Sequence, residues 1–265
     1  MARLQLDLHE LFNRGRAIDQ ERGRVIHEAV EKKTGAPRPG ASSDNGVILA
    51  STERRPEAMR PQRYAVLDFE TTGMSPAQGA RPTEIGIVRV CEGRIVDRYQ
   101  SLMNPGQPIP YDIQTFTGIT DAMVRRAPTV RDVMAQVVHF VGGDPIVAHN
   151  AAFDRKFWAQ ETASLSVHAP NRFLCSLLLA RRLFPATPNH KLETLVSALG
   201  LPTAGRFHRA LADAECTAHL FIRLQEEVRQ SFDLDDCDCG LLEKLQATSK
   251  HQLARCVERH LATVD

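Results

Sequence analysis

The feature that most constrains the fold is a series of short, β-rich apolar runs that begins at residue 64. The five runs that read as strands are Tyr64–Glu70, Glu84–Cys91, Arg94–Leu102, Pro145–Ala148 and Arg172–Cys175. Helical patterns lie at 130–141, 151–160, 176–184, 191–199 and 209–229. Three successive strands followed by alternating helices and strands predict an α/β protein whose mixed five-stranded sheet is flanked by helices.

The chain divides into three regions by composition. Residues 1–62 form an N-terminal arm that starts with a helical apolar stripe and continues into a linker rich in Pro, Gly, Ser and charge. The compact domain is expected over 63–230, and 231–265 are expected to form a C-terminal helical tail. The arm is expected to pack on the chain itself or on a symmetry mate, or to dock a protein partner.

Charge and hydropathy exclude several classes of protein. Lys and Arg total 33 against 32 for Asp and Glu, so the chain lacks the basic excess of non-specific nucleic-acid binders. It contains no apolar run of the roughly 18 residues that a membrane span needs. Mixed charges in the first thirty residues disfavour a secretory signal, and the six scattered cysteines are typical of reduced thiols. We therefore expect a cytoplasmic protein without a membrane partner.

Four carboxylates and one histidine stand out by their positions. Asp68 and Glu70 lie two apart at the end of the first strand, so they point to one face of it. Asp154 lies where a strand ends and a helix opens; Asp213 lies in the first turns of the last long helix, with His208 on the loop before it. Each acid alone would more often be a solvated edge or a helix cap. Carboxylates gathered from several such points are what Mg²⁺ or Mn²⁺ selects.

Three sequence blocks contain these five residues, and they read DFETTG at 68–73, HNAAFD at 149–154 and HRALAD at 208–213. The blocks resemble those of the DEDD exonucleases with histidine, the family of the epsilon proofreading subunit of DNA polymerase III. EIGIV at 84–88, TGIT at 117–120 and HKLETLVSALGLP at 190–202 also resemble that family, in the same order. The likeness implies a ribonuclease H-like fold and a metal-dependent 3′–5′ exonuclease that releases nucleoside 5′-monophosphates from DNA, with single strands favoured.

The resemblance also implies a role for each residue of the site. Asp68, Glu70, Asp154 and Asp213 would hold two divalent ions, Mg²⁺ or Mn²⁺, with Asp154 acting partly through water. One ion would lie near Asp68, Glu70 and Asp213, and the other near Asp68 and the scissile phosphate. His208 would accept a proton from the attacking water, a general-base contribution of about 10²–10⁴ in rate.

The substrate-binding residues expected from the resemblance are Thr72, Gly73, Ile119, Asn150 and Phe153. Thr72 and Gly73 would offer hydroxyl or backbone contacts to the terminal nucleotide, and the turn that they form is expected to have free backbone N–H groups. Ile119 would be an apolar wedge beside the last base or, equally, a residue that fills the core. Phe207 could stack on bases, whereas core packing is the favoured interpretation for Phe153.

Three other functions stay open at this stage. An exoribonuclease on the same fold differs only in whether its pocket tolerates a 2′-hydroxyl. A non-catalytic nucleic-acid or protein-binding module would be favoured had any of the five residues been replaced. A hydrolase of small phosphorylated metabolites would need a closed pocket instead of an open groove. The expected partner is a nucleic-acid 3′ end, and a proofreading role would need a polymerase partner, bound through the arm.

The C-terminal tail contains side chains of the types that bind zinc, which are Cys237, Cys239, His251, Cys256 and His260. Their spacing, C-x-C followed by H-x₄-C-x₃-H, does not fit a zinc signature. The favoured interpretation is a helical tail with Cys256 and His260 one turn apart on its packed side.

Overall fold

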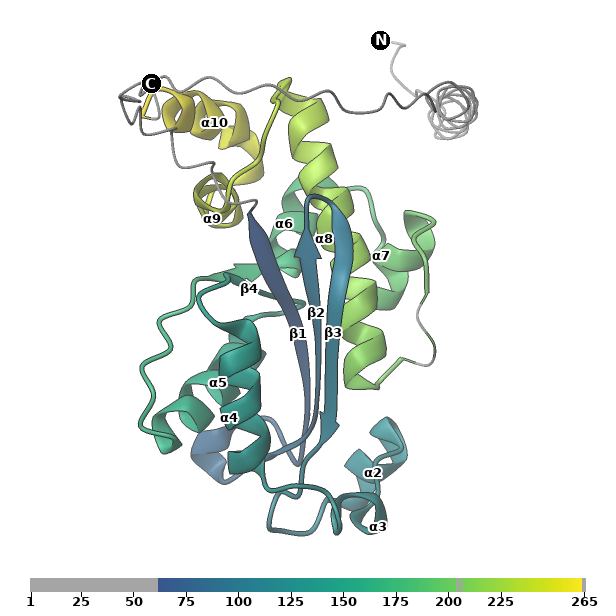
Figure 1. Cartoon of the computed structure of the whole chain (residues 1–265). Coiled ribbons are helices and arrows are strands. Elements are labelled where there is room, and N and C mark those ends of the chain that lie inside the picture. Colours follow the sequence, from purple (N-terminus) through teal and green to yellow (C-terminus); the bar gives the residue numbers. More distant parts are fainter. Residues whose placement is uncertain (1–61, 204, 206, 264–265) are drawn as a thin grey trace, which may run out of the picture. The chain divides into compact units, whose positions relative to one another are not determined.

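A five-stranded sheet in the order β3-β2-β1-β4-β5 forms the centre of the protein (Figure 1). β1 (Arg63–Thr71) pairs antiparallel with β2 (Pro82–Cys91), which pairs antiparallel with β3 (Arg94–Leu102). β4 (Ile146–Ala148) runs parallel to β1, and β5 (Phe173–Cys175) runs parallel to β4. The mixed five-stranded sheet predicted from the sequence is confirmed.

The computed structural model describes residues 62–203, 205 and 207–263. The expected N-terminal arm, apart from residue 62, therefore lies outside the described residues, and the three-region division stays a prediction. Among the described helices, none is both long and apolar enough to cross a membrane. None of the six cysteines, all of which are described, forms a disulfide.

Helices cover both faces of the sheet (Figure 1). The bounds of the main helices are α4 Val130–Val141, α5 Ala152–Ser164, α6 Ser176–Leu183, α7 Leu192–Ala198 and α8 Ala210–Phe232. Ala65, Leu67 and Phe69 belong to one apolar cluster with residues of α4 and α5, whereas Tyr64 and Val66 belong to another with residues of α6, α7 and α8. Because side chains alternate along a strand, the even-numbered residues of β1 face α8.

Two short helices, α2 (Tyr111–Thr117) and α3 (Asp121–Val124), follow β3 and were not expected from the sequence. Gly118 ends α2 with a φ of 75°, which glycine adopts without strain. The hydroxyl of Thr120 accepts a hydrogen bond from the backbone N–H of Met123 at the start of α3. A 3₁₀ turn, η1 (Pro76–Gln78), lies between β1 and β2.

The C-terminal tail folds back on the domain. It consists of α9 (Cys239–Ala247), the 3₁₀ turn η2 (Lys250–Gln252) and α10 (Leu253–Leu261), and its apolar side chains belong to the cluster around α8. The side chain of Gln246 accepts a hydrogen bond from the N–H of Cys175 (2.7 Å) and donates one to the carbonyl oxygen of Phe173 (3.1 Å). The tail is therefore joined to the backbone of β5 by the side-chain hydrogen bonds of Gln246 as well as by apolar packing.

Candidate active site

Three of the four predicted acids meet where the end of β1 faces the first turns of α8. Asp68 and Glu70 continue the even-numbered face of β1, and Asp213 lies in the first turn of α8. One carboxylate oxygen from each of these three residues lies within 4.8 Å of the others. In the described part of the chain, no other set of three or more His, Cys, Asp or Glu side chains gathers in this way.

Burial and mutual repulsion raise the pKa of each acid in this cluster. The pKa of Asp68 is well above its ordinary value because of burial and of the charges of Asp154 and Glu70. Burial, with the charge of Asp213 next, raises the pKa of Glu70 to about 8. Burial raises the pKa of Asp213 to about 6, although the hydrogen bond that it accepts from the backbone N–H of His208 acts in the opposite direction. In the absence of a metal ion, burial and repulsion thus favour the protonated forms of these acids, and a divalent cation would relieve the repulsion.

One oxygen of Asp213 fits the role of a metal ligand. Its Oδ2 accepts a hydrogen bond from the backbone N–H of His208 (2.9 Å), whereas its buried Oδ1 has no hydrogen-bond partner among the described residues. A buried oxygen left without a partner is costly, and carboxylate oxygens are the preferred ligands of Mg²⁺. The donor set of Asp68, Glu70 and Asp213 therefore suits a hard divalent cation.

Asp154 lies beside this cluster without joining it. It occupies the first turn of α5, is almost fully buried, and its Oδ1 accepts a hydrogen bond from the backbone N–H of Phe69 (3.2 Å). Burial raises its pKa to about 7, although that hydrogen bond acts in the opposite direction. Asp154 thus contacts the backbone of β1 between Asp68 and Glu70, from the first turn of α5.

His208 lies on the loop before α8, as the sequence predicts, with a left-handed φ of 64°. Its imidazole ring stacks against Phe116 of α2, with 3.9 Å between the ring centroids. Its Nε2 lies 3.6 Å from Oε1 of Glu193 on α7. The ring therefore contacts two residues to which the sequence assigned no role. Glu193 lies within the block at 190–202 and Phe116 directly before the block at 117–120, but neither block indicates a contact with His208.

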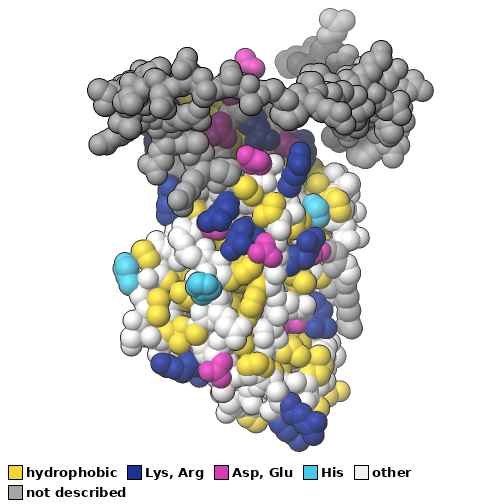
Figure 2. Space-filling model, viewed as in Figure 1, with side chains coloured by type: hydrophobic (Ala, Val, Ile, Leu, Met, Phe, Trp, Pro, Cys, Tyr) yellow, Lys and Arg dark blue, Asp and Glu magenta, His cyan; other side chains and the backbone are white. Residues whose placement is uncertain are grey.

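A groove of about 770 Å³ contains Asp68, Asp213 and His208 in its wall. Phe116, Leu177 and Phe207 supply apolar surface to this groove, and Arg181 and Lys191 supply positive charge. Elsewhere, on the face that Figure 2 shows, basic side chains are interspersed with acidic and apolar ones. An anionic ligand would therefore be held by these few local groups.

His149 supports the floor of the groove. Its Nε2 lies 2.9 Å from the carbonyl oxygen of His190, so Nε2 is the protonated nitrogen, and its Nδ1 lies 3.0 Å from the hydroxyl of Ser176. Burial lowers the pKa of His149 to about 4. This neutral imidazole joins the end of β4 to α6 and to the loop that contains Lys191.

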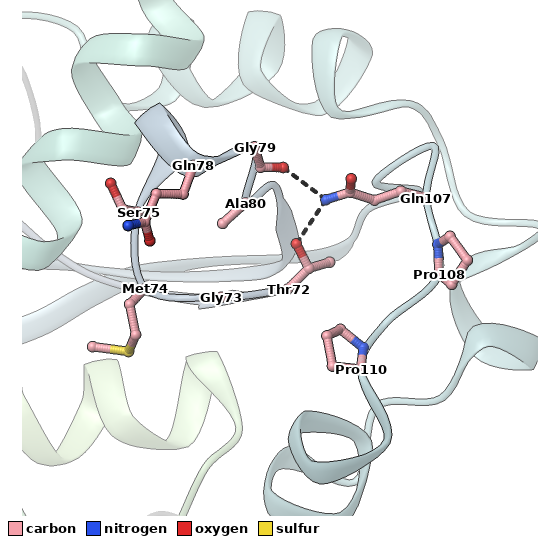
Figure 3. Close-up of a pocket in the computed structure, with 10 residues that line it drawn as sticks. All are labelled: Thr72, Gly73, Met74, Ser75, Gln78, Gly79, Ala80, Gln107, Pro108 and Pro110. Carbon is pink, nitrogen blue, oxygen red and sulfur yellow. Dashed lines mark hydrogen bonds between the residues drawn. The ribbon is translucent and has the colours of Figure 1, made fainter.

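A smaller cavity of about 250 Å³ lies beside the turn that follows β1 (Figure 3). The side chain of Gln107 donates hydrogen bonds to the hydroxyl of Thr72 and to the carbonyl oxygen of Gly79, each 2.8 Å long. The N–H of Arg81 donates a third, to the same hydroxyl (2.9 Å). The backbone N–H of Thr72 donates to the carbonyl oxygen of Arg81 (2.9 Å), so the expectation that it is free is wrong.

The other expected substrate-binding residues occupy different environments. Gly73 lines the small cavity, and Asn150, with a left-handed φ of 67°, lines the groove. Ile119 is fully buried and packs with Ile109 and other apolar residues around α3, which fits the core-packing alternative. The ring of Phe153 packs against Phe157, 5.0 Å between centroids.

Three cysteines and one histidine of the tail serve packing and hydrogen bonding. Cys237, Cys239 and Cys256 are buried in the cluster around α8. The Nε2 of His260 lies 3.3 Å from Asp238, and its Nδ1 lies 3.0 Å from the ammonium of Lys244. These contacts are those of a packed helical tail.

Comparison with known proteins places the chain in a family. The exonuclease model RNase T matches residues 65–221. DNA polymerase III PolC-type from Caldanaerobacter subterraneus subsp. tengcongensis is 34% identical over 191 residues, or 72% of this chain and 13% of that protein. The PolC-type protein of Oceanobacillus iheyensis is 37% identical over 186 residues, with 70% and 13% coverage.

This chain also superposes on a solved structure of exonuclease X in complex with 5′ overhanging duplex DNA, with a TM-score of 0.55 and 28% sequence identity. The match covers 69% of this chain and 99% of the exonuclease X chain. This chain thus spans about an eighth of the length of the polymerases that it matches, and almost the whole of the exonuclease X chain. The match includes all five residues of the predicted site, from Asp68 to Asp213. The chain belongs to the RNase T family and is a DEDDh 3′–5′ exonuclease.

Proposed function

We propose that this exonuclease removes nucleotides from the 3′ end of single-stranded DNA and releases nucleoside 5′-monophosphates. The observation that carries the proposal is the cluster of Asp68, Glu70 and Asp213, of which Asp68 and Asp213 line the wall of an open groove. The PolC-type relatives are DNA polymerases, and the exonuclease X structure contains DNA. The phenylalanine side chains of the groove offer stacking surfaces, which suit the unpaired bases of a single strand.

The same cluster supports dependence on two divalent cations, Mg²⁺ or Mn²⁺. Asp68, Glu70 and Asp213 would hold the first, and Asp68, with Asp154 acting partly through water, would hold the second. Two cations held by these residues would supply stabilisation of the negative charge that develops in an in-line phosphoryl displacement. His208 then accepts the proton of the attacking water, and Glu193, 3.6 Å from its Nε2, stabilises the charge that the ring gains.

Contacts to the terminal nucleotide are proposed for Thr72 and Gly73. Gln107 and Arg81 already donate to the hydroxyl of Thr72, and a hydroxyl accepts at most two hydrogen bonds. Its remaining capacity is to donate, so it suits a sugar or phosphate oxygen. Arg181 and Lys191 of the groove suit the phosphates upstream. The polymerase partner expected through residues 1–62 stays a prediction.

One panel of substrates tests the proposal. Labelled single-stranded DNA, duplex DNA and RNA of one sequence are incubated with Mg²⁺, Mn²⁺ or EDTA, and the products are separated by size. We expect stepwise loss of nucleoside monophosphates from the 3′ end of single-stranded DNA, with no cleavage in EDTA. Faster degradation of RNA would identify an exoribonuclease, and full activity in EDTA would refute the metal assignment.

Two aspartate variants test whether the activity comes from the proposed site. Asp68→Ala removes a proposed ligand of both cations. Asp97→Ala is the matched control, because Asp97 is a half-exposed carboxylate on β3 that pairs with Arg89. Loss of activity in the first variant alone supports the assignment.

A further inference from the structure

A buried carboxylate on β2 holds the start of α8. Glu84 is fully buried. Its Oε2 accepts a hydrogen bond (3.1 Å) from the backbone N–H of Ala210, the first residue of α8. The guanidinium of Arg209, the residue before the helix, donates to both oxygens of Glu84 (3.0 and 2.7 Å). Gln100 of β3 donates to Oε1 as well (2.8 Å).

This contact replaces the usual cap of the helix. The first N–H groups of a helix have no partner within it, and a negative group near them is favourable. The side chain of Arg209 caps no backbone group of α8. The cap of this helix thus comes from the neighbouring strand, which fixes where the helix begins relative to the sheet.

Gly86 fixes the same relationship by close approach. A Cβ atom added at Gly86 would lie 2.2 Å from the backbone nitrogen of Leu211 and 2.3 Å from the carbonyl carbon of Ala210. The first turn of α8 therefore rests directly on the backbone of β2. Only glycine leaves room for this contact.

The register of the sheet places these contacts opposite the metal-binding acids. Glu84 pairs with Glu70 across β1 and β2, and Gly86 pairs with Asp68. Asp213 follows Ala210 by three residues on α8, so its carboxylate moves with the first turn of the helix. A small shift of that turn would change the separation of Asp213 from Asp68.

Arg209 also compensates the charge of Glu84. An unpaired carboxylate at a buried position is strongly unfavourable, and Glu84 adds to the negative charge around Glu70 and Asp213. The forked guanidinium of Arg209 satisfies both oxygens at once, which an ammonium cannot do.

We propose that Glu84 and Arg209 are positioning residues that set the spacing of the metal-binding carboxylates by holding the first turn of α8 against β2. The inference rests on the proposed metal site. Neither side chain is needed as a ligand: they act through the helix that contains Asp213.

The test measures Mn²⁺ affinity and thermal stability separately, on the full-length protein. Mn²⁺ binding is titrated by calorimetry, and the melting temperature is recorded in EDTA, for Glu84→Gln and Arg209→Ala. The matched control is Glu161→Gln, which breaks a similar pair with Arg81 (3.1 Å) at a residue with 2% exposure on α5. We expect both test variants to bind Mn²⁺ at least about tenfold more weakly, and the control to lose stability without losing affinity.

Each alternative predicts a different result. If the pair acted only through charge, Arg209→Ala would leave an uncompensated carboxylate and bind Mn²⁺ more tightly, which would overturn the positioning role. A lower melting temperature with unchanged affinity would show a merely structural role and overturn it too. If Glu84→Gln fails to fold, Arg209→Lys tests the positioning role, because it keeps the positive charge but loses the guanidinium that bonds both oxygens of Glu84. This variant should bind Mn²⁺ more weakly than the wild type. Wild-type protein that binds no Mn²⁺ would refute the proposed function as well.

Discussion

On the face of β1 that packs against α4 and α5, the side chains stay apolar from Ala65 to Phe69, whereas on the face toward α8 Val66 is followed by Asp68 and Glu70. Both faces belong to one strand and share its backbone hydrogen bonds. The first face buries apolar surface from Ala65 to Phe69, which stabilises the fold. The face toward α8 ends instead in Asp68 and Glu70, whose carboxylates lie close enough to repel each other. Apolar packing and the two proposed metal ligands of β1 thus lie on opposite sides of one strand.

The largest effect expected on the α8 face is that of Asp68→Ala. Turnover should fall by more than about a thousandfold, as for removal of a central catalytic group, because the proposed ligand of both cations is lost. The same variant should melt at a higher temperature in EDTA, since it removes a carboxyl group whose ionised form is disfavoured by burial and by the neighbouring acids. Initial rates with saturating Mg²⁺ and thermal melts, beside Asp97→Ala, measure the two effects. A lower melting temperature would contradict the division between the faces.

His208→Ala should lower turnover by a factor of about 10²–10⁴, because the variant lacks the proposed acceptor for the proton of the attacking water. Mn²⁺ affinity should change less than in Asp213→Ala, since His208 lies outside the carboxylate cluster. Single-turnover rates with saturating Mg²⁺ give the effect, with His139→Ala, an exposed histidine on α4, as the control. Near-wild-type turnover would make His208 a structural residue.

Met134→Ala tests the apolar face. Met134 is fully buried on α4, and its truncation should lower the free energy of unfolding by about 2–5 kcal/mol. Mn²⁺ affinity should not change, because α4 contributes no residue to the site. Urea denaturation measures the loss, and Met134→Leu, which conserves volume, should cost less than about 1.5 kcal/mol. Weaker Mn²⁺ binding in a folded Met134→Ala would show that the two faces are coupled.

The smallest effect is a pH dependence confined to the metal-free protein. The pKa of Glu70 is raised to about 8 and that of Asp213 to about 6, so folding favours their protonated forms. That contribution is complete below the ordinary values near pH 4 and is lost as pH rises through 6 to 8. The melting temperature in EDTA should therefore fall over this range, less steeply in Glu70→Gln, and Mn²⁺ should restore it most at high pH. A rising melting temperature would contradict these pKa directions.

The sequence predicts the sheet and the acids because both leave local signals. Alternation along β1 places Asp68 and Glu70 on one face, and the block around Asp213 marks the start of α8. The helices α2 and α3 have seven and four residues, too few for a periodic pattern, so Phe116 beside His208 could not be foreseen. The role of Glu84 depends on strand register and on a helix 126 residues away, which no local pattern contains.

The hydrogen bonds of Gln246 lie at β5, an outer strand of the sheet, where another protein chain could pair. The outer edge of a sheet presents unpaired N–H and carbonyl groups, which another chain can use to extend the sheet. At β5 the amide of Gln246 bonds the N–H of Cys175 and the carbonyl oxygen of Phe173, and α9 packs against the strand. The docked tail therefore protects this edge against strand addition. Loss of the tail would leave these two groups of β5 open to pairing with another chain.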